Sequence, residues 1–390
     1  MAPGGQALKA GHLGARVPGI SRLVVLPSPY YVKTEELAQL RGVDPQHVVE
    51  GLGMEGITVL YDKSLEELGL EALRELDISD AELLLVATES SPDLSKPMGA
   101  KILERLGLNH VGTVELKFAC VSGCYGALFA SERVKAGGGP VAILCVDEAL
   151  YERESGTAEF TQGAGAVAFR LEADAPLELE LARPGYYTAD VDDFLKPMRL
   201  TPIVDGRLSI MGYIFAMKMA IELWKRKHGR ASVLDHLDHM VFHMPFAKMA
   251  EWAFASLYAH ERMPGALHHH TEEALKDEAL YEAWRRERKQ VMQLSEFQEL
   301  YRKKVYPSTL IGRKIGNLYT GSLWASLASL FLHGMPQRGE VVGFGGYGSG
   351  LGSMVFTGQI RGFPKVVYRE PRERLSAQEY LAWRRSRGLS

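Results

Sequence analysis

Apolar positions along the chain follow two periods, one typical of buried strands and the other typical of amphipathic helices. In the first half, strand-length apolar runs lie at 21–27, 82–86, 113–118 and 141–146. Segments with helical spacing separate these runs, at 64–76, up to 106 and at 125–136. The first helical segment begins with a capping box, Ser64 to Glu67. Strands that alternate with helices at this spacing predict βαβ units, with a mixed or parallel sheet covered on both faces.

The second half repeats this pattern, so we expect two similarly built halves. Helices are predicted at 209–227, from 246 onward and at 322–333, and strands at 240–243, 341–345 and 353–359. Between them, the charged segment 259–304 is rich in helix formers and is expected to form a solvated helical excursion. Its adjacent histidines, His268 to His270, lack the spacing that directs ligands at one metal ion, so we expect them to face solvent.

Length and charge narrow the class of protein. The 390 residues exceed the roughly 250–300 at which one hydrophobic core stops growing, which fits two large units. A net charge of −3 argues against nucleic acid or an anionic membrane as a partner over the whole surface. The longest apolar runs are strand-sized, far short of the ~20 residues of a membrane helix. Residues 1–18 are predicted to be a flexible tail without the apolar core of a secretion signal, so we expect a cytoplasmic location.

Three cysteines are too few for a disulfide framework in a chain of this length. Cys120 lies where a predicted strand gives way to a helix. The free N–H groups and the dipole at a helix N-terminus lower a thiol pKa and favour a nucleophilic thiolate there. The alternative is a buried, unreactive cysteine. Cys124, one turn into the same helix, and Cys145, inside an apolar strand, are better explained by packing.

Three more polar residues lie at the ends of predicted elements. Glu89 follows a buried strand, at the edge where open α/β sheets bind ligands, and burial there raises a carboxyl pKa into the range of general acid-base catalysis. His243 ends another apolar strand, and Asn317 lies in a polar turn before the helix at 322–333. The structural alternatives are a solvent-facing carboxylate, a core histidine and a helix cap. Together with Cys120, these residues indicate acyl transfer through a cysteine thioester.

Nine short motifs follow one another between residue 20 and about residue 359. They are Tyr30-Tyr31-Val32, Val43-Asp44-Pro45, Val86 to Ser90, Glu115 to Cys120, Thr161 to Ala168, Pro202 to Ser209, His243 to Met249, Gly316 to Leu323 and Tyr347 to Gly350. In this order they resemble the hydroxymethylglutaryl-CoA synthase family of the thiolase superfamily. The family's Lys-x-Ala-Cys pattern matches Lys117 to Cys120. The chain departs from the family directly afterwards, where Val121-Ser122-Gly123 precedes Cys124-Tyr125-Gly126.

This resemblance implies an α/β, thiolase-like fold with two duplicated βαβ halves in a five-layered α-β-α-β-α arrangement, normally a homodimer. We expect a flexible N-terminal tail at 1–18 and an N-terminal half at 19–185 that carries Glu89 and Cys120. A C-terminal half at 186–368 would carry His243 and Asn317, with the helical excursion at 259–304. A C-terminal tail would cover 369–390.

The resemblance also implies a reaction: condensation of acetyl-CoA with acetoacetyl-CoA and water to give hydroxymethylglutaryl-CoA and CoA, a step of the mevalonate route to isoprenoids. Cys120 would carry the acetyl group, Glu89 would act as acid and base, and His243 would hold the acetoacetyl thioester. The positions implied to bind substrate are Asp147, Thr161, Asp193, Ser209, Lys248, Asn317, Tyr319 and Ser349. No metal and no other cofactor is implied, since the CoA thioesters are substrates.

Other functions fit parts of the same pattern. A synthase of the same fold could take its acetyl group from an acyl carrier protein, as in polyketide β-branching. A condensing enzyme similar to ketoacyl synthase III would share the cysteine, histidine and asparagine but would not need Glu89. A catalytically inactive protein with a thiolase fold is a further alternative, against which the presence of all four residue types argues.

Overall fold

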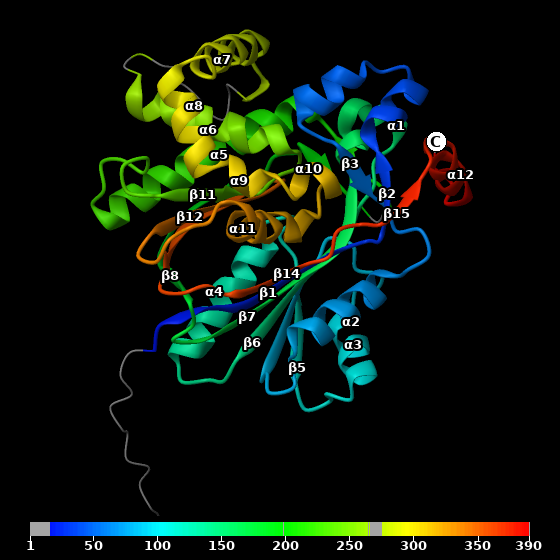
Figure 1. Cartoon of the computed structure of the whole chain (residues 1–390), viewed down its shortest axis with the longest axis vertical. Helices are drawn as coiled ribbons and strands as arrows, with labels where there is room; N and C mark the ends of the chain where they lie inside the picture. Colours follow the sequence, from blue (N-terminus) through cyan, green and yellow to red (C-terminus); the bar gives the residue numbers. More distant parts are fainter. Residues whose placement is uncertain (1–15, 198, 264, 266–274, 390) are drawn as a thin grey trace, which may run out of the picture.

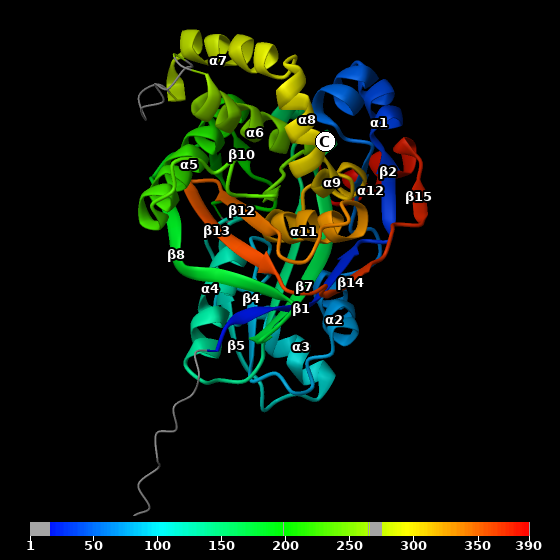
Figure 2. The same cartoon turned by 60° about the vertical axis from the view of Figure 1, so that its left-hand side comes forward.

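The computed structural model describes residues 16–197, 199–263, 265 and 275–389 (Figures 1 and 2). Most of the predicted tail at 1–18, and all of His268 to His270, lie outside the described residues. Strands gather in the middle of the molecule, with helices above, below and between them (Figure 1). Within the described ranges, none of the helices combines the length and the apolar character needed to span a membrane.

The strands show that the two halves are duplicates. The first half contributes β1 (Pro18–Pro27), β4 (Leu83–Ala87), β5 (Gly112–Leu116), β6 (Val141–Ala149) and β7 (Gly163–Ala173), in the order β5-β4-β6-β7-β1. The second half contributes β8 (Leu177–Thr188), β11 (His239–Phe242), β12 (Val341–Gly348) and β13 (Gly352–Ile360), in the order β11-β12-β13-β8. In each half a parallel pair, β4 with β6 or β11 with β12, is followed by antiparallel pairs. The duplication predicted from the sequence is confirmed.

Helices complete five layers. The outer layer of the first half is α2 (Leu65–Leu76) with α3 (Met98–Leu106), and its buried face packs on β1, β6 and β7. The central layer is α4 (Ser122–Lys135) with α11 (Ser322–His333). The outer layer of the second half is α5 (Gly206–His228) with α6 (Ala247–Arg262). Three clusters of buried apolar side chains fill the spaces between the layers, one around the central helices and one under each outer layer, so the five-layered arrangement is also confirmed.

The boundary between the halves differs from the expected one at 185/186. β8 runs unbroken across that position and pairs with β13 of the second half from Leu177 onward. It meets β1 only through Gly19 and Ile20. The topology therefore changes between Ala173 and Leu177, where one strand ends and the next begins. The first residues of β8 alternate between buried and more exposed positions, which is typical of a strand with one buried face. They therefore form part of the second-half sheet and not a linker.

The segment expected as a C-terminal tail, 369–390, folds within its described part. Residues Glu373–Leu375 form β15 and residues Ala377–Ser386 form α12. β15 pairs with β2 (Tyr30–Lys33), which pairs in turn with β3 (Gly56–Thr58). A capping box, Ser376 to Glu379, starts α12, and the side chains of Tyr380 and Trp383 on this helix are buried. Figure 1 shows α12 beside β2 and α1 (Thr34–Arg41).

The charged excursion is helical, but it is not only a solvated surface. Its described part contains α7 (Glu278–Val291) and α8 (Ser295–Lys304), which cover α6. Trp284 and Phe297 are buried in that contact. The Arg288 guanidinium lies between the rings of Trp252 and Trp284, 3.8 and 4.5 Å from their centroids. Spaced apolar residues within a charged sequence therefore give these helices a buried face.

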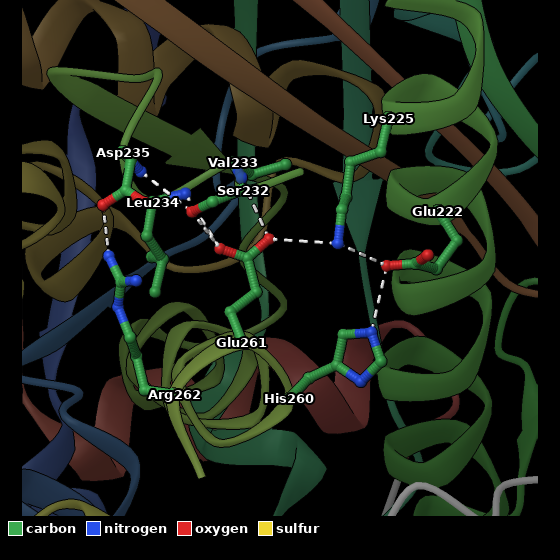
Figure 3. Close-up of polar contacts among 9 residues, drawn as sticks. All are labelled: Glu222, Lys225, Ser232, Val233, Leu234, Asp235, His260, Glu261 and Arg262. Carbon is green, nitrogen blue, oxygen red and sulfur yellow. Dashed lines mark hydrogen bonds and ion pairs between the residues drawn. The ribbon is translucent and has the colours of Figure 1, made fainter. Parts of the chain in front are cut away.

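A polar network locks α5 to the end of α6 (Figure 3). The Glu261 carboxylate accepts the Ser232 hydroxyl at 2.7 Å and the Val233 N–H at 2.9 Å, and its side chain is only 3% exposed. Lys225 of α5 lies between Glu261 and Glu222. The network fixes the turn that leads into β11. The remaining elements are η1 (His47–Leu52), η2 (Arg153–Thr161), β9 (Phe194–Leu195), β10 (Ile203–Val204), α9 (Tyr306–Thr309), α10 (Gly312–Ile315), η4 (Tyr319–Gly321) and β14 (Lys365–Tyr368).

Candidate active site

Glu89 is held in place by a second carboxylate, Asp147. The two residues follow the register of the parallel pair β4 and β6, in which Ala87 lies opposite Cys145. Oδ1 of Asp147 accepts the backbone N–H of Glu89 at 2.7 Å and the hydroxyls of Thr88 and Ser90 at 3.0 and 2.9 Å. The buried strands therefore deliver Glu89 to the sheet edge, and Asp147 fixes the backbone that carries it.

The Glu89 carboxyl is poised near neutrality. Burial, followed by the neighbouring charge of Asp147, raises the pKa of Glu89 to about 7. Its Oε1 is buried and has no hydrogen-bond partner among the described residues. Lys196 opposes the rise in pKa, and its ammonium donates to the Glu89 carbonyl at 3.2 Å while lying 5.8 Å from the centroid of the Tyr319 ring. A carboxyl group with this pKa can both accept and donate a proton at physiological pH.

Cys120 lies beside Glu89, at the junction of β5 and α4. The chain turns at Ala119, whose φ of +43° is in the left-handed region, and Ser122 accepts the Phe118 N–H at 2.6 Å. The Cys120 thiol and the Glu89 carboxyl are close enough that each shifts the pKa of the other. The expectation of a lowered thiol pKa is wrong, because burial and then the charge of Glu89 raise the pKa of Cys120 well above its usual value. The thiol therefore needs a base, and Glu89 is within its reach.

The other two cysteines are packing residues. Cys124 and Cys145 are 2% and 1% exposed and belong to the central cluster of apolar side chains. A Cβ atom at Gly346 would lie 2.5 Å from the Cys124 sulfur, so the chain has closed around that side chain. Burial raises the pKa of both thiols. The geometry thus supports Cys120, rather than Cys124, as the nucleophile.

His243 enters the site from the second half, at the end of β11. Its N–H donates to Gly345 at 2.9 Å, and its carbonyl accepts the Tyr213 hydroxyl at 2.7 Å. The imidazole packs near Tyr213 and Tyr347, with ring centroids 6.4 and 6.3 Å away. Burial lowers the pKa of His243 to about 3, and its Nδ1 is buried without a partner among the described residues. The ring is therefore neutral at physiological pH.

The turn before α11 brings Asn317 and Tyr319 to the same place. Oδ1 of Asn317 accepts the Tyr319 N–H at 2.9 Å and the Ser322 hydroxyl at 2.8 Å, which leaves the amide nitrogen as the donor end of the side chain, next to Tyr151. Tyr319 is buried, with φ of +44°, and packs with Cys120 and Tyr151. Thr320 donates its N–H and hydroxyl to Asp147 Oδ2, at 3.2 and 2.5 Å. Asp147 therefore ties the two halves together at the site.

A third buried carboxylate, Asp193, organises the wall formed by the second half. It accepts the Ser209 hydroxyl at 2.9 Å, the Tyr347 hydroxyl at 3.3 Å and the Gly350 N–H at 2.8 Å. Burial raises the pKa of Asp193, and Ser349 is among the donors that lower it. Its charge acts on Glu89, and Tyr347 is in turn close enough to Cys120 to be affected by it. The polar residues around Asp193 therefore lie next to Glu89 and Cys120.

Three of the residues predicted to bind substrate are engaged in contacts within the chain. Asp147 is fully buried and both of its oxygens accept protein donors, so its observed contacts hold the Glu89 segment. The Thr161 hydroxyl donates to the Ala158 carbonyl at 2.8 Å, and the Thr161 carbonyl accepts the Asn317 N–H. Thr161 therefore supports the loop that carries Asn317. Lys248 is paired with Glu251 at 2.6 Å on α6. The Glu251 carboxylate therefore partly neutralises the charge of Lys248 within the chain.

Sequence reasoning missed two residues of the site, Lys196 and Tyr151. Lys196 lies three residues after Asp193, which the sequence analysis places among the substrate-binding positions, and this proximity is the signal that could have drawn attention to it. Tyr151 is 5% exposed, packs with Tyr319 and Cys120, and lies just beyond the strand that carries Asp147. Over the described ranges, no group of three His, Cys, Asp or Glu side chains is arranged to hold a metal ion.

These features define a class. Two duplicated halves meet at a pair of central helices, with a cysteine before one and an asparagine before the other, so the protein is a thiolase-fold condensing enzyme. Residues 178–381 match the family described as hydroxymethylglutaryl-coenzyme A synthase C terminal. A hydroxymethylglutaryl-CoA synthase of Schizosaccharomyces pombe is 30% identical over 381 residues, covering 88% of this chain and 82% of the relative. The chain belongs to the hydroxymethylglutaryl-CoA synthase family, whose members are acyltransferases of the thiolase superfamily.

Solved structures agree with this membership. The protein MvaS in complex with 3-hydroxy-3-methylglutaryl coenzyme A superimposes with a TM-score of 0.80 at 27% identity, covering 94% of this chain and 91% of that one. The curacin biosynthetic HMG synthase, in complex with an acetyl donor acyl carrier protein, superimposes with a TM-score of 0.79 at 22% identity, covering 94% and 88%. At that identity the second similarity shows the fold alone.

Proposed function

We propose that this chain condenses acetyl-CoA with acetoacetyl-CoA and water to give hydroxymethylglutaryl-CoA and CoA, through an acetyl group on Cys120. The observation that carries the proposal is the pairing of the Cys120 thiol with the Glu89 carboxyl, whose pKa is about 7. A thiol with a raised pKa and a carboxyl with a raised pKa share one proton between them. The pair can therefore start as a thiol beside a carboxylate and exchange the proton during the reaction.

The first step transfers the acetyl group. Glu89 takes the Cys120 proton as the sulfur attacks the acetyl carbonyl carbon of acetyl-CoA. The C–S bond to CoA breaks, and the leaving CoA thiolate takes up the proton that Glu89 received. The products are acetyl-Cys120 and CoA thiol, so atoms and charge balance. Glu89 is left as a carboxylate for the next step.

The second step forms the new carbon-carbon bond. The Glu89 carboxylate removes a proton from the acetyl methyl group, and the resulting carbanion attacks the ketone carbon of acetoacetyl-CoA. Glu89 then returns the proton to the new alkoxide. The neutral His243 ring and the amide nitrogen of Asn317 hold the acetoacetyl thioester in attack geometry, where fixed orientation lowers the barrier. Water then hydrolyses the Cys120 thioester, which releases hydroxymethylglutaryl-CoA and restores the thiol.

Several groups around the site would contact the CoA thioesters. Ser209 and Ser349 lie around Asp193, and Lys248, in the first turn of α6, lies near Gly53 and Arg313, where basic groups suit the phosphates of CoA. Tyr319 closes the side next to Cys120. This chemistry draws only on protein side chains and thioester substrates. The pathway setting, mevalonate and isoprenoid synthesis, and a cytoplasmic location stay predictions from the sequence.

A homodimer is part of the proposal. β5 is the last strand in the order of the first-half sheet, and its Val114 is 46% exposed. Phe129, on the neighbouring helix α4, is 49% exposed. An edge strand with exposed apolar residues beside it is suited to pairing with a second copy. The solution mass of the native chain, measured by light scattering, tests this part.

The acetyl donor distinguishes the main alternative. The similarity to the curacin synthase in fold keeps an acyl carrier protein as a second candidate donor. Intact-protein mass spectrometry after incubation with acetyl-CoA, on the native chain, Cys120→Ser and Cys124→Ser, decides between the donors. We expect an adduct of one acetyl group on the native chain and on Cys124→Ser, and none on Cys120→Ser. An adduct formed only from an acetylated carrier protein would replace CoA as the donor.

Two further variants test the condensation step. Glu89→Ala should lose condensation by about 10²–10⁴-fold, the usual contribution of a general acid-base group. His243→Ala should keep the acetyl adduct and lose its discharge by acetoacetyl-CoA. If Glu89→Ala condenses at the native rate, the chain works like ketoacyl synthase III instead. If no variant or native chain is ever acetylated by either donor, the inactive-scaffold alternative holds.

A further inference from the structure

The C-terminal helix α12 reaches into the support of the active site from outside the recognised motifs. The family match ends at residue 381, in the middle of α12, and the nine sequence motifs end earlier. Beyond that point Arg384 is completely buried and Arg387 is half-buried. A fully buried arginine is rare unless it is paired. Its partners therefore show what α12 does.

Arg384 holds the chain at Tyr151, which packs against Cys120 and Tyr319. Its Nη2 donates to the Tyr151 carbonyl at 2.8 Å, and its Nε lies 3.4 Å from the Glu159 carboxylate. Tyr380, one turn earlier on α12, accepts the Gln162 amide at 2.5 Å and donates to Glu159 at 3.2 Å. Glu159 lies in η2, which ends at Thr161, and Gln162 follows it directly; the Thr161 carbonyl accepts the Asn317 N–H. One helix thus braces two walls of the site.

Arg387 acts on the Glu89 side. Its guanidinium forms a bidentate ion pair with the Glu148 carboxylate, in which Nη1 donates to Oε1 and Nη2 donates to Oε2 at 2.9 Å. Glu148 is 7% exposed, and its backbone N–H donates to Ser90 Oγ at 3.1 Å. Ser90 Oγ donates in turn to Asp147 Oδ1 at 2.9 Å, the same oxygen that accepts the Glu89 N–H. Arg387 is therefore linked to the backbone of Glu89 through four consecutive polar contacts.

We propose that Arg384 and Arg387 are positioning residues, through which α12 fixes the loops after β4 and β6 and so sets the geometry of Glu89 against acetyl-Cys120. The inference rests on the proposed function, because it concerns the proton transfer assigned to Glu89. Arg387 is the sharper test, since it is half-buried rather than completely buried, and the charge that its loss leaves unpaired on Glu148 is removed in the Glu148→Gln and double variants. Removing Arg387 lets the Glu148 segment shift, and a shift of about 1 Å at a catalytic group lowers a rate by up to about 100-fold.

The experiment compares Arg387→Gln, Glu148→Gln and the double variant with Arg385→Gln as the control. Arg385 lies on the same helix, carries the same charge and is exposed. Acetylated Cys120 is counted by mass spectrometry in every protein, and kcat and KM for acetoacetyl-CoA are expressed per acetylated site. This normalisation removes any fraction of protein that fails to fold. Arg387→Lys, which keeps the charge but offers a single point contact, is the conservative rescue.

We expect Arg387→Gln and Glu148→Gln each to lower kcat per acetylated site about tenfold with little change in KM, and the double variant to be no worse than either alone. Arg387→Lys should recover part of the rate, and Arg385→Gln should behave as the native chain. Equal kcat in Arg387→Gln and Arg385→Gln, while the native chain condenses normally, would overturn the positioning role alone. A native chain that is never acetylated would instead overturn the proposed function. A loss that appears only in the number of acetylated sites would assign α12 to stability and not to positioning.

Discussion

The backbone N–H of Glu89 donates to Oδ1 of Asp147 at 2.7 Å, which places two carboxyl groups from neighbouring parallel strands side by side in the interior. Their surroundings differ. Asp147 accepts donors on both oxygens, including two hydroxyls at 2.9 and 2.5 Å, whereas Oε1 of Glu89 has no partner among the described residues. The charge therefore resides on Asp147, and Glu89 is the group that gains and loses the proton near neutrality.

This pairing predicts the pH dependence of the reaction. Glu89 must be a carboxylate to remove the methyl proton, and its pKa is about 7. Below that pH, kcat/KM for acetoacetyl-CoA should fall about tenfold per pH unit, and above it the value should level off. His243 does not contribute to this rise, because its pKa is lowered to about 3. Steady-state kinetics between pH 5.5 and 8.5 measure the midpoint, and a midpoint near 4.5 would contradict the raised pKa.

Replacing the charge on Asp147 should move that midpoint. Asp147→Asn removes the negative charge that raises the Glu89 pKa, so the midpoint should shift to lower pH. The same change turns one accepting oxygen into an NH₂ group that faces donors, which should cost about 3 kcal/mol of stability. Urea unfolding measures the cost, and kinetics per acetylated site measure the midpoint. An unchanged or higher midpoint in the folded variant would refute the electrostatic role.

Lys196 should act in the opposite direction. Its ammonium lowers the Glu89 pKa, so Lys196→Met should shift the midpoint to higher pH and reduce the rate at pH 6 more than at pH 8.5. Since the side chain is half-buried at the site, stability should change little. Arg199→Gln, in the same segment and exposed, is the matched control. A rate loss that is equal at every pH would mean that Lys196 contacts substrate rather than tunes Glu89.

The network of Figure 3 should matter for stability and not for chemistry. Glu261→Gln replaces a buried carboxylate that accepts three donors and lies 3.5 Å from Lys225. We expect a loss of about 2 kcal/mol in the free energy of unfolding, with kcat per acetylated site unchanged. Chemical denaturation beside Glu299→Gln, an exposed glutamate on α8, provides the comparison. A fall in kcat in the folded variant would show that the turn before β11 also positions His243.

Local sequence rules were sufficient for much of the fold. The capping box at Ser64 and Glu67 predicted the start of α2, and the apolar spacing predicted α11 at Ser322–His333 with the bounds that the structure has. Capping and periodicity depend on contacts within a few residues, which is why they can be read without a structure. The same kind of rule applies to α12, because Ser376 and Glu379 form a capping box at its start, so the prediction of a tail at 369–390 is wrong over the described part of that segment.

By itself the sequence determined the alternation of strands and helices, the duplication, and the candidates Glu89, Cys120, His243 and Asn317. Only the tertiary structure decided how these groups are charged and held. A local rule predicted a lowered pKa for Cys120, yet burial and Glu89 raise it. Arg384 donates a hydrogen bond to the Tyr151 carbonyl, 233 positions away in the sequence, and Asp147 accepts one from the Thr320 hydroxyl, 173 positions away. Electrostatic environment and support come from segments distant in the chain, so they arise only when the layers have packed.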